Sequence, residues 1–149
     1  MIKYLIVAGF LFSLNNLHAQ ILTFDHGKIE FYTKTIVSDI EAITEKVFVK
    51  LDVQNRNIET TIDIKSFEFE DDLMQEHFNE KYLESDRFPK ATFQGKILQD
   101  ISNIIEEIEA GVSGSLTIHG VTKEIEVKVQ ISKKEDFTYI KSLLSGKTN

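Results

Sequence analysis

A strict alternation of polar and apolar residues constrains this chain more than any other feature. Residues 124–131 read Glu-Ile-Glu-Val-Lys-Val-Gln-Ile, and on a β-strand this order places all four aliphatic side chains on one face. Shorter runs of the same kind occur at 47–53, 62–65, 91–97 and 116–118, and turn-forming residues separate them. Several short alternating strands punctuated by turns predict an antiparallel β-sandwich or β-barrel.

One segment departs from the period of two. Within 71–83, apolar residues recur every three or four positions, and the segment begins with two aspartates, whose negative charge suits a helix N-terminus. Pro89 cannot continue a helix and favours an extended conformation at Phe88. We therefore predict one short helix at 71–83. The spacing of the isoleucines also suits a helical turn at 102–110, where a loop is the alternative.

The first nineteen residues have the pattern of a secretory signal peptide. Lys3 precedes an apolar run at 4–14, and Ala19 is a small residue at the expected cleavage position. The run is too short to cross roughly 30 Å of hydrocarbon as a helix, which needs about 20 residues. We expect residues 1–19 to be removed and residues 20–149 to form one domain, since about 130 residues suffice for a single core.

The composition argues against several kinds of partner. The chain has 17 Lys and Arg against 24 Asp and Glu, a formal net charge of −7, and loss of Lys3 with the signal peptide would remove one more positive charge. This acidic balance argues against nucleic acid or an anionic membrane surface as the main partner. The sequence contains no cysteine, so we expect neither disulfides nor a thiolate zinc site nor a lipid anchor on cysteine.

The alternation fits two kinds of barrel, and the polar face distinguishes them. An outer-membrane barrel turns its apolar residues outward to lipid, whereas a soluble barrel turns them inward. Glu124, Glu126 and Lys128 share one face, and the sequence shows no aromatic girdle of the kind that marks a membrane interface. We therefore expect a charged exterior, an apolar interior and no stable membrane insertion. An eight-stranded soluble barrel either fills its interior with side chains or holds one small apolar ligand, and alternation alone leaves both open.

Two stretches of the chain resemble the YceI-like family of secreted lipid-binding barrels. They are 74–97, MQEHFNEKYLESDRFPKATFQGKI, and 114–127, GSLTIHGVTKEIEV. The resemblance implies an all-β, lipocalin-like antiparallel barrel with one short helix, located in the periplasm of a Gram-negative bacterium. It also implies strand and loop rather than helix at 102–110, a helical lid that ends at Phe88 and Pro89, and a hairpin closed by Gly120.

By the same resemblance, the interior is a tunnel for a long apolar ligand such as an isoprenoid quinone or a polyprenyl lipid. The protein would sequester or carry this ligand without catalysing a reaction. Met74 and Phe78 would lie at the mouth of the tunnel. Inward-facing apolar side chains would line it, and these are Ile29, Phe31, Val49, Leu51, Ile62, Ile64, Phe93, Ile97, Leu116, Ile118, Ile125, Val127 and Val129.

The C-terminal end departs from the family pattern. Family members usually continue with further strands, whereas this chain ends in the polar segment SGKTN. We expect a strand or a pair of strands to be missing, which would leave the barrel incomplete at its C-terminus. Unpaired edge strands associate readily. The alternative function is therefore a truncated, binding-incompetent or scaffold barrel that pairs through its open edge as a homodimer.

Catalytic motifs are weak in this sequence. His77, His119 and Glu76 are the ligand types of a catalytic zinc site, which leaves a metal-dependent hydrolase as a third and weaker hypothesis, but no spacing requires it. Ser113 and Ser115 lack the glycine pattern and the strand-to-helix setting of a nucleophile elbow. The sequence has no phosphate-binding glycine loop. We therefore expect no catalytic residue, no metal and no cofactor.

Overall fold

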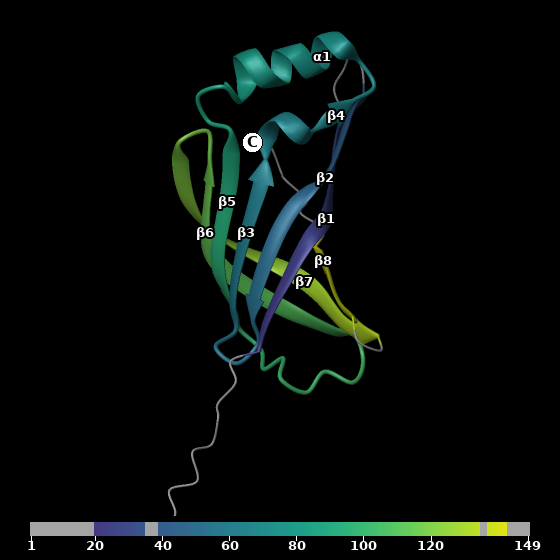
Figure 1. Ribbon diagram of the computed structural model, residues 1–149, viewed down its shortest axis with the longest axis vertical. Helices are drawn as coiled ribbons and strands as arrows, with labels where there is room; N and C mark the ends of the chain where they lie inside the picture. The colour runs from purple at the N-terminus through teal and green to yellow at the C-terminus, as the bar shows by residue number, and fades with distance from the viewer. Residues whose placement is uncertain (1–19, 35–38, 135–136, 143–149) are drawn as a thin grey trace, which may run out of the picture.

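An antiparallel β-sheet dominates the computed structural model, which describes residues 20–34, 39–134 and 137–142 (Figure 1). The sheet order is β1-β2-β3-β5-β6-β7-β8, and the short strand β4 pairs with β2. The predicted all-β antiparallel fold with one short helix is confirmed. The predicted signal peptide lies outside the described residues. The strands are β1 (Ile21–Lys34), β2 (Asp39–Asp52), β3 (Asn57–Asp63), β4 (Glu68–Phe69), β5 (Lys90–Ile97), β6 (Ile108–Ile118), β7 (Val121–Lys134) and β8 (Phe137–Ser142). The helical elements are η1 (Ile64–Ser66), α1 (Asp72–His77) and η2 (Phe78–Tyr82).

The sheet curls around an apolar interior. In Figure 1, β6 and β7 run obliquely to β2 and β3. Leu51 of β2 and Ile131 of β7 are far apart in the strand order, yet both are fully buried in one apolar cluster. Among the described residues β1 does not pair with β8, so the predicted barrel is open along this seam.

The strand at the other edge of the seam was not assigned from the sequence. β8 pairs with β7, and the register runs from Val129 opposite Ser142 to Lys134 opposite Phe137. Its sequence, FTYIKS, alternates poorly and has only six residues, which is why the period of two did not reveal it. β8 therefore adds a strand beyond the run at 124–131, while the sheet stays open among the described residues.

The alternation at 124–131 is confirmed by burial. Val129 and Ile131 are buried, whereas the polar residues between the aliphatic positions are exposed. The pairing continues this inward face across the sheet, because Val127 lies opposite Val112, and Val112 lies opposite Ile97. The inward face is apolar and the outward face is charged, as the sequence predicts.

β1 and β2 bend together in mid-strand. Thr44 and Val47 are both buried and the two residues between them are exposed, so the inward face of β2 shifts by one position. The pairing register shifts on both sides of Gly27. A Cβ atom on Gly27 would lie 3.0 Å from Cβ of Val47, so the close approach of the strands at this bend favours glycine.

The predicted helix is confirmed as α1 continued by η2. The carboxylate of Asp71 caps α1 by accepting a hydrogen bond of 2.7 Å from the amide of Met74. The ring of Phe78 packs against Phe67 and Phe69, with centroid distances of 5.5 and 4.8 Å. These contacts hold the helix across one end of the sheet (Figure 1). Within the described ranges, no helix is long and apolar enough to cross a membrane.

The strand predicted at 62–65 is wrong in its second half. β3 ends at Asp63, and its carboxylate accepts a hydrogen bond of 3.1 Å from the amide of Lys65, which starts the turn of η1. The amide of Ile64 donates to the carbonyl of Pro89 at 2.9 Å. A local side-chain cap therefore ends the strand where the alternation would continue it.

The helical turn considered at 102–110 is also wrong, and the loop alternative is confirmed. β6 begins at Ile108, and residues 98–107 form a loop. The carboxylate of Asp100 accepts hydrogen bonds from the amide and the hydroxyl of Ser102, at 2.9 and 2.7 Å. Ile101 and Ile104 both pack into the apolar interior from a loop instead of a helix.

Candidate ligand-binding interior

Two apolar clusters occupy the interior. The lid-end cluster lies beneath the helix, and the loop-end cluster lies where residues 98–107 cross the opposite end of the sheet. The lid-end cluster consists of Ala42, Ile64, Phe67 and Ala91, with Phe78 of η2 packed against it. The loop-end cluster consists of Leu51, Ile58, Ile97, Ile101, Ala110, Val112, Val129 and Ile131.

Residues 98–107 close the loop end of the interior. Ile101 is only 5% exposed, and Ile104 packs against the same cluster. The loop is fixed to the sheet near its start, where the amide of Gly111 donates to Oε1 of Gln99 at 2.8 Å. Apolar side chains therefore fill this end.

The inward face of β6 and β7 becomes more exposed toward the lid. On β6 the exposed fraction rises from 1% at Val112 to 37% at Ile118, and Leu116 between them is half-buried. On β7, Val129 is buried whereas Ile125 is half-buried. Among the described residues, neither cluster includes Leu116, Ile118 or Ile125. Apolar inward-facing surface therefore remains uncovered at the lid end.

The predicted lining residues occupy different kinds of position. Leu51, Ile97 and Val129 are buried members of the loop-end cluster, and Ile118 is exposed at the end of β6. The half-buried, inward-facing residues are Ile29, Val49, Ile62, Phe93, Leu116, Ile125 and Val127.

Four predicted residues need separate comment. Ile64 is not on a strand but is buried in η1 as part of the lid-end cluster. Met74 and Phe78, predicted at the mouth, are half-buried on the helix. Phe31 pairs with Ala42, and its side chain lies outside the described residues.

Sequence reasoning missed several interior residues. Ile101 and Ile104 lie in a loop, where no period of burial exists to reveal them. Ala110 lies in the segment 102–110, for which a helical turn and a loop were both considered, and Val112 follows it outside the predicted strands. Both share the parity of Leu116 on the same strand. Continuing the alternation backward from Leu116 through the glycine at 114 is the signal that would have found them.

β5 and β6 approach closely in the middle of this interior. Gly95 lies opposite Gly114, and a Cβ atom on Gly114 would lie 2.4 Å from the Cα of Gly95 and 2.2 Å from the carbonyl oxygen of Gln94. A Cβ atom on Gly95 would lie 2.6 Å from the ring of Phe93. The ring of Phe93 therefore lies along its own strand over Gly95, between the loop-end cluster and the uncovered surface.

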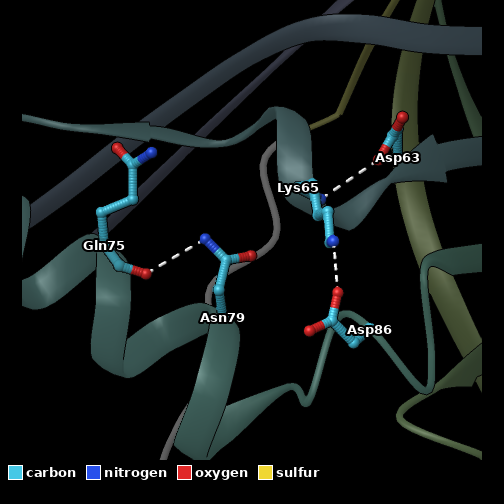
Figure 2. A network of polar contacts seen from close by, with 5 residues as sticks. All are labelled: Asp63, Lys65, Gln75, Asn79 and Asp86. Atoms are coloured by element: carbon cyan, nitrogen blue, oxygen red, sulfur yellow. Dashed lines mark hydrogen bonds and ion pairs between the residues drawn. The ribbon is translucent and has the colours of Figure 1, made fainter.

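A polar depression of about 300 Å³ lies beside the helix and is different in character from the interior (Figure 2). Lys65 pairs with Asp86 there, and Nδ2 of Asn79 donates to the carbonyl of Gln75 at 3.1 Å. Within the described part of the chain, Oδ1 of Asn79 is buried without a hydrogen-bond partner. The pair of Lys65 and Asp86 joins η1 to the turn that follows the helix, whereas the contact of Asn79 with Gln75 lies within the helix. The lining residues are Lys65, Asn79, Glu80, Ser85 and Asp86.

A second polar contact joins the segment after the helix to β6 and β7. The lid turn, residues 84–88, lies against the tip of the β6–β7 hairpin, where Oε2 of Glu84 is 2.7 Å from Nε2 of His119. The ring of Phe88 meets the imidazole edge-on, with centroids 4.9 Å apart. The lid turn is thus fastened to the strands whose inward face is uncovered.

Comparison with known protein families matches residues 12–149, most of the chain, to the YceI-like domain. The protein belongs to the YceI-like family. The resemblance carried by 74–97 and 114–127 is confirmed. Among curated proteins, none matches this chain.

Solved structures share the architecture of this YceI-like protein. A polyisoprenoid-binding domain from Saccharophagus degradans, implicated in plant cell wall breakdown, has a TM-score of 0.66 and 14% identity, over 77% of this chain and 68% of that chain. BcnA from Burkholderia cenocepacia has a TM-score of 0.60 and 22% identity, over 77% of this chain and 72% of that chain. At these identities the likeness shows the fold alone.

The geometry of this YceI-like protein does not form the zinc site considered for a hydrolase. Across residues 20–34, 39–134 and 137–142, no group of three or more His, Asp or Glu side chains could hold a metal ion. His77 lies 3.1 Å from Nζ of Lys81, while His119 contacts Glu84. The meeting of His77, His119 and Glu76 that this hypothesis required is therefore wrong.

Proposed function

We propose that this YceI-like protein binds one long apolar ligand, such as an isoprenoid quinone or a polyprenyl lipid, inside the curled sheet. It sequesters or carries this ligand and catalyses no reaction. The observation that carries the proposal is the uncovered apolar surface near the lid, where Leu116 and Ile125 are half-buried and belong to neither apolar cluster. A filled core would have covered these side chains.

The polyisoprenoid-binding domain from Saccharophagus degradans supports the proposal, because it has the same fold. A ligand of that class suits this chain on its own residues. Phe93 lies opposite Leu116, so an aromatic and an aliphatic side chain adjoin on the inward face. An apolar chain gains roughly 25 cal/mol per Å² removed from water, and part of this gain is offset by lost motion on binding. The length of the apolar chain should therefore dominate affinity.

The compartment is part of the same proposal. A positive residue, an apolar run and a small residue at the expected cleavage position support export and removal of residues 1–19. A mature chain in the periplasm would meet lipids that leave the inner membrane. The mass of the protein purified from a periplasmic extract tests this directly, because an uncleaved chain would contradict it.

The open seam between β1 and β8 favours a second candidate function. In the described part of the chain each of these strands pairs on one side only, and unpaired strand edges associate with other strands. The protein would then be a binding-incompetent scaffold that forms a homodimer through this edge.

Native mass spectrometry distinguishes the two candidates. The chain is purified from its own cells without detergent, weighed intact, and its bound material is extracted with organic solvent. One isoprenoid lipid per chain supports the proposed function. A folded dimer with no lipid contradicts it and supports the scaffold.

Substitution of Phe93 tests where the ligand binds. Phe93→Asp places a charge on the inward face beside Leu116, so lipid uptake should be abolished. Gln94→Asp is the matched control, because residue 94 is the next position on β5 and is exposed on the outer face. Uptake is measured by lipid extraction, and circular dichroism checks that both variants fold. Unchanged uptake by folded Phe93→Asp would remove this residue from the site.

A further inference from the structure

We propose that the ligand enters and leaves between the lid turn and the tip of the β6–β7 hairpin, and that the contact of Glu84 with His119 is the latch of this entrance. The inference rests on the proposed function, because it assigns the route by which an apolar ligand reaches the interior.

The two ends of the interior differ in what closes them. At the loop end, Ile101 and Ile104 pack into the cluster of buried side chains. At the lid end, the inward-facing side chains of the hairpin are exposed, and Val121, which pairs with Ile118, is 52% exposed. From Ile118 the inward face of β6 continues through Leu116 to the loop-end cluster. An apolar ligand therefore finds accessible apolar surface at the hairpin tip that leads into the interior.

The lid is fastened differently on its two sides. Toward β4, Phe78 packs on Phe67 and Phe69 in the lid-end cluster. Toward the hairpin, the fastening is the contact of Glu84 with His119, whose side chains are both partly exposed to solvent, together with the single edge-on contact of Phe88 with the same imidazole. An exposed pair of this kind contributes little stability and opens readily, whereas an apolar cluster opens at the cost of its buried surface. The lid should therefore open on the hairpin side and pivot on the aromatic side.

The backbone places both latch residues in the left-handed region. φ is 43° at Glu84 and 51° at His119. Gly120 follows with φ 71°, so both central residues of the hairpin turn have positive φ, a turn for which Asn-Gly is the preferred sequence. The lid turn is held by the carbonyl of Glu84, which accepts hydrogen bonds from the amides of Arg87 and Phe88 at 2.8 and 2.9 Å.

These conformations explain what the two side chains do. The left-handed region is sparsely populated by a glutamate, and it costs free energy unless the surroundings hold it. At both positions the side chain is directed to the other latch residue, and the turn at His119 would form at least as well with asparagine. The imidazole and the carboxylate therefore serve the contact between lid and hairpin rather than the turns that carry them.

Rates of ligand exchange test the latch. His119→Asn and Glu84→Asn suit a left-handed backbone and remove the contact. Asp86→Asn is the matched control, because it removes the ion pair that joins the same lid turn to Lys65 of η1. All-trans-retinol serves as the probe, since it is an isoprenoid whose fluorescence rises in apolar surroundings. Stopped-flow fluorescence measures its uptake and its release into phosphatidylcholine vesicles.

The two latch variants should raise both rates about threefold, the change expected from losing one partly exposed polar contact that holds the closed state. Kd should stay within about twofold, because uptake and release share one barrier. Asp86→Asn should exchange at the wild-type rates. Wild-type rates in both latch variants, or an equal rise in Asp86→Asn, would overturn the latch while leaving ligand binding intact. Failure of the wild type to bind retinol would overturn the proposed function and the latch together.

A covalent bridge gives an independent result. The chain has no cysteine, so Glu84→Cys combined with His119→Cys supplies the only two thiols, and a short bismaleimide can join them. The bridged protein should neither take up nor release retinol. Each single-cysteine variant treated with the same reagent is the control and should exchange normally. Release at the wild-type rate from the bridged protein would show that the ligand uses another route.

Discussion

At the scale of single residues, the absence of a side chain is as consequential here as its presence. Gly114 and Gly95 bring the backbones of β5 and β6 so close that a methyl group on Gly114 would meet backbone atoms only 2.2 and 2.4 Å away. Backbone in the middle of a paired sheet cannot move aside as a flexible side chain can. The curvature that encloses the interior therefore depends on this pair of glycines.

Gly114→Ala should consequently destabilise the fold. We expect a loss of about 1 to 3 kcal/mol in the free energy of unfolding, the usual cost of overpacking. Gly111→Ala on the same strand is the control, because its added Cβ would meet Cδ1 of the exposed Leu98 side chain at 3.0 Å, and that side chain can move. Urea denaturation measures both variants. Equal stability of Gly114→Ala and wild type would contradict the close approach.

The carboxyl group of Asp52, which lies at a turn, makes the stability of the fold depend on pH under acidic conditions. Backbone and side-chain hydrogen bonds from Asn55, at 2.9 and 2.8 Å, lower the pKa of this carboxyl in the folded protein. The folded pKa lies below the unfolded pKa, so the stabilisation is present above the unfolded pKa and is lost as pH falls through the folded pKa. Carbon-detected NMR titration should place Asp52 below a model aspartate, and Asp52→Ala should flatten the acid limb of the stability curve. Titration at the ordinary value would refute this.

Lys123 is the candidate contact for the head group of the proposed ligand. It lies opposite Leu116 with the inward parity of Ile125, and it is exposed at the lid end of β7. Lys123→Ala should therefore weaken binding of geranylgeranyl phosphate about three- to tenfold, as expected for one exposed charge contact, and leave geranylgeraniol unaffected. Lys128→Ala is the control, because this side chain pairs with Glu109 on the outer face. Titration calorimetry with both lipids measures the difference, and equal loss for the alcohol and the phosphate would exclude a charge contact.

At the scale of elements, the loop 98–107 acts as a packed end of the interior rather than as a connection. Two of its isoleucines, four residues apart in the sequence, differ sharply in burial: Ile101 is buried in the loop-end cluster, whereas Ile105 is 89% exposed. The buried side chain of Ile101 therefore attaches this loop to the loop-end cluster.

Ile101→Ala should destabilise the protein by about 2 to 5 kcal/mol, the range for large-to-small substitution in a core. Ile105→Ala removes the same atoms from an exposed position and should change stability by less than about 0.5 kcal/mol. Chemical denaturation measures both, and hydrogen exchange shows whether the loop end opens. A small effect of Ile101→Ala would mean that this loop does not close the interior.

At the scale of the whole molecule, the sequence predicts the structure of those segments in which a single force dominates. The run at 124–131 is long, buried on one face and solvated on the other, so the hydrophobic effect alone fixes its strand and its orientation. At Asp63, a side-chain cap overrides the alternation and turns the chain into η1. At Ile101, burial follows from tertiary contact in a loop, which has no period to detect. β8 is short and placed by its pairing with β7.

The candidate site was predictable to the same degree. Parity identified the inward face of the strands, and hence Phe93, Leu116 and Ile125. It could not show which inward residues fill the core and which stay uncovered, because that depends on how far the sheet curls and on what the loop and the helix cover. The latch could not be predicted from the sequence for a similar reason. Glu84 and His119 are distant in sequence and meet only once the lid lies across the sheet.

The packed loop end closes the far end of the proposed binding site, so the site limits how much of an apolar chain it can hold. Along β6, the six steps from buried Val112 to exposed Ile118 span about 20 Å at roughly 3.3 Å per residue. A lipid tail that enters at the hairpin stops against the loop-end cluster, so tails shorter than this span leave apolar surface unused and longer tails leave carbon atoms outside. The end of the apolar chain that enters first must leave last. The head group stays at the entrance, where an acceptor can reach it.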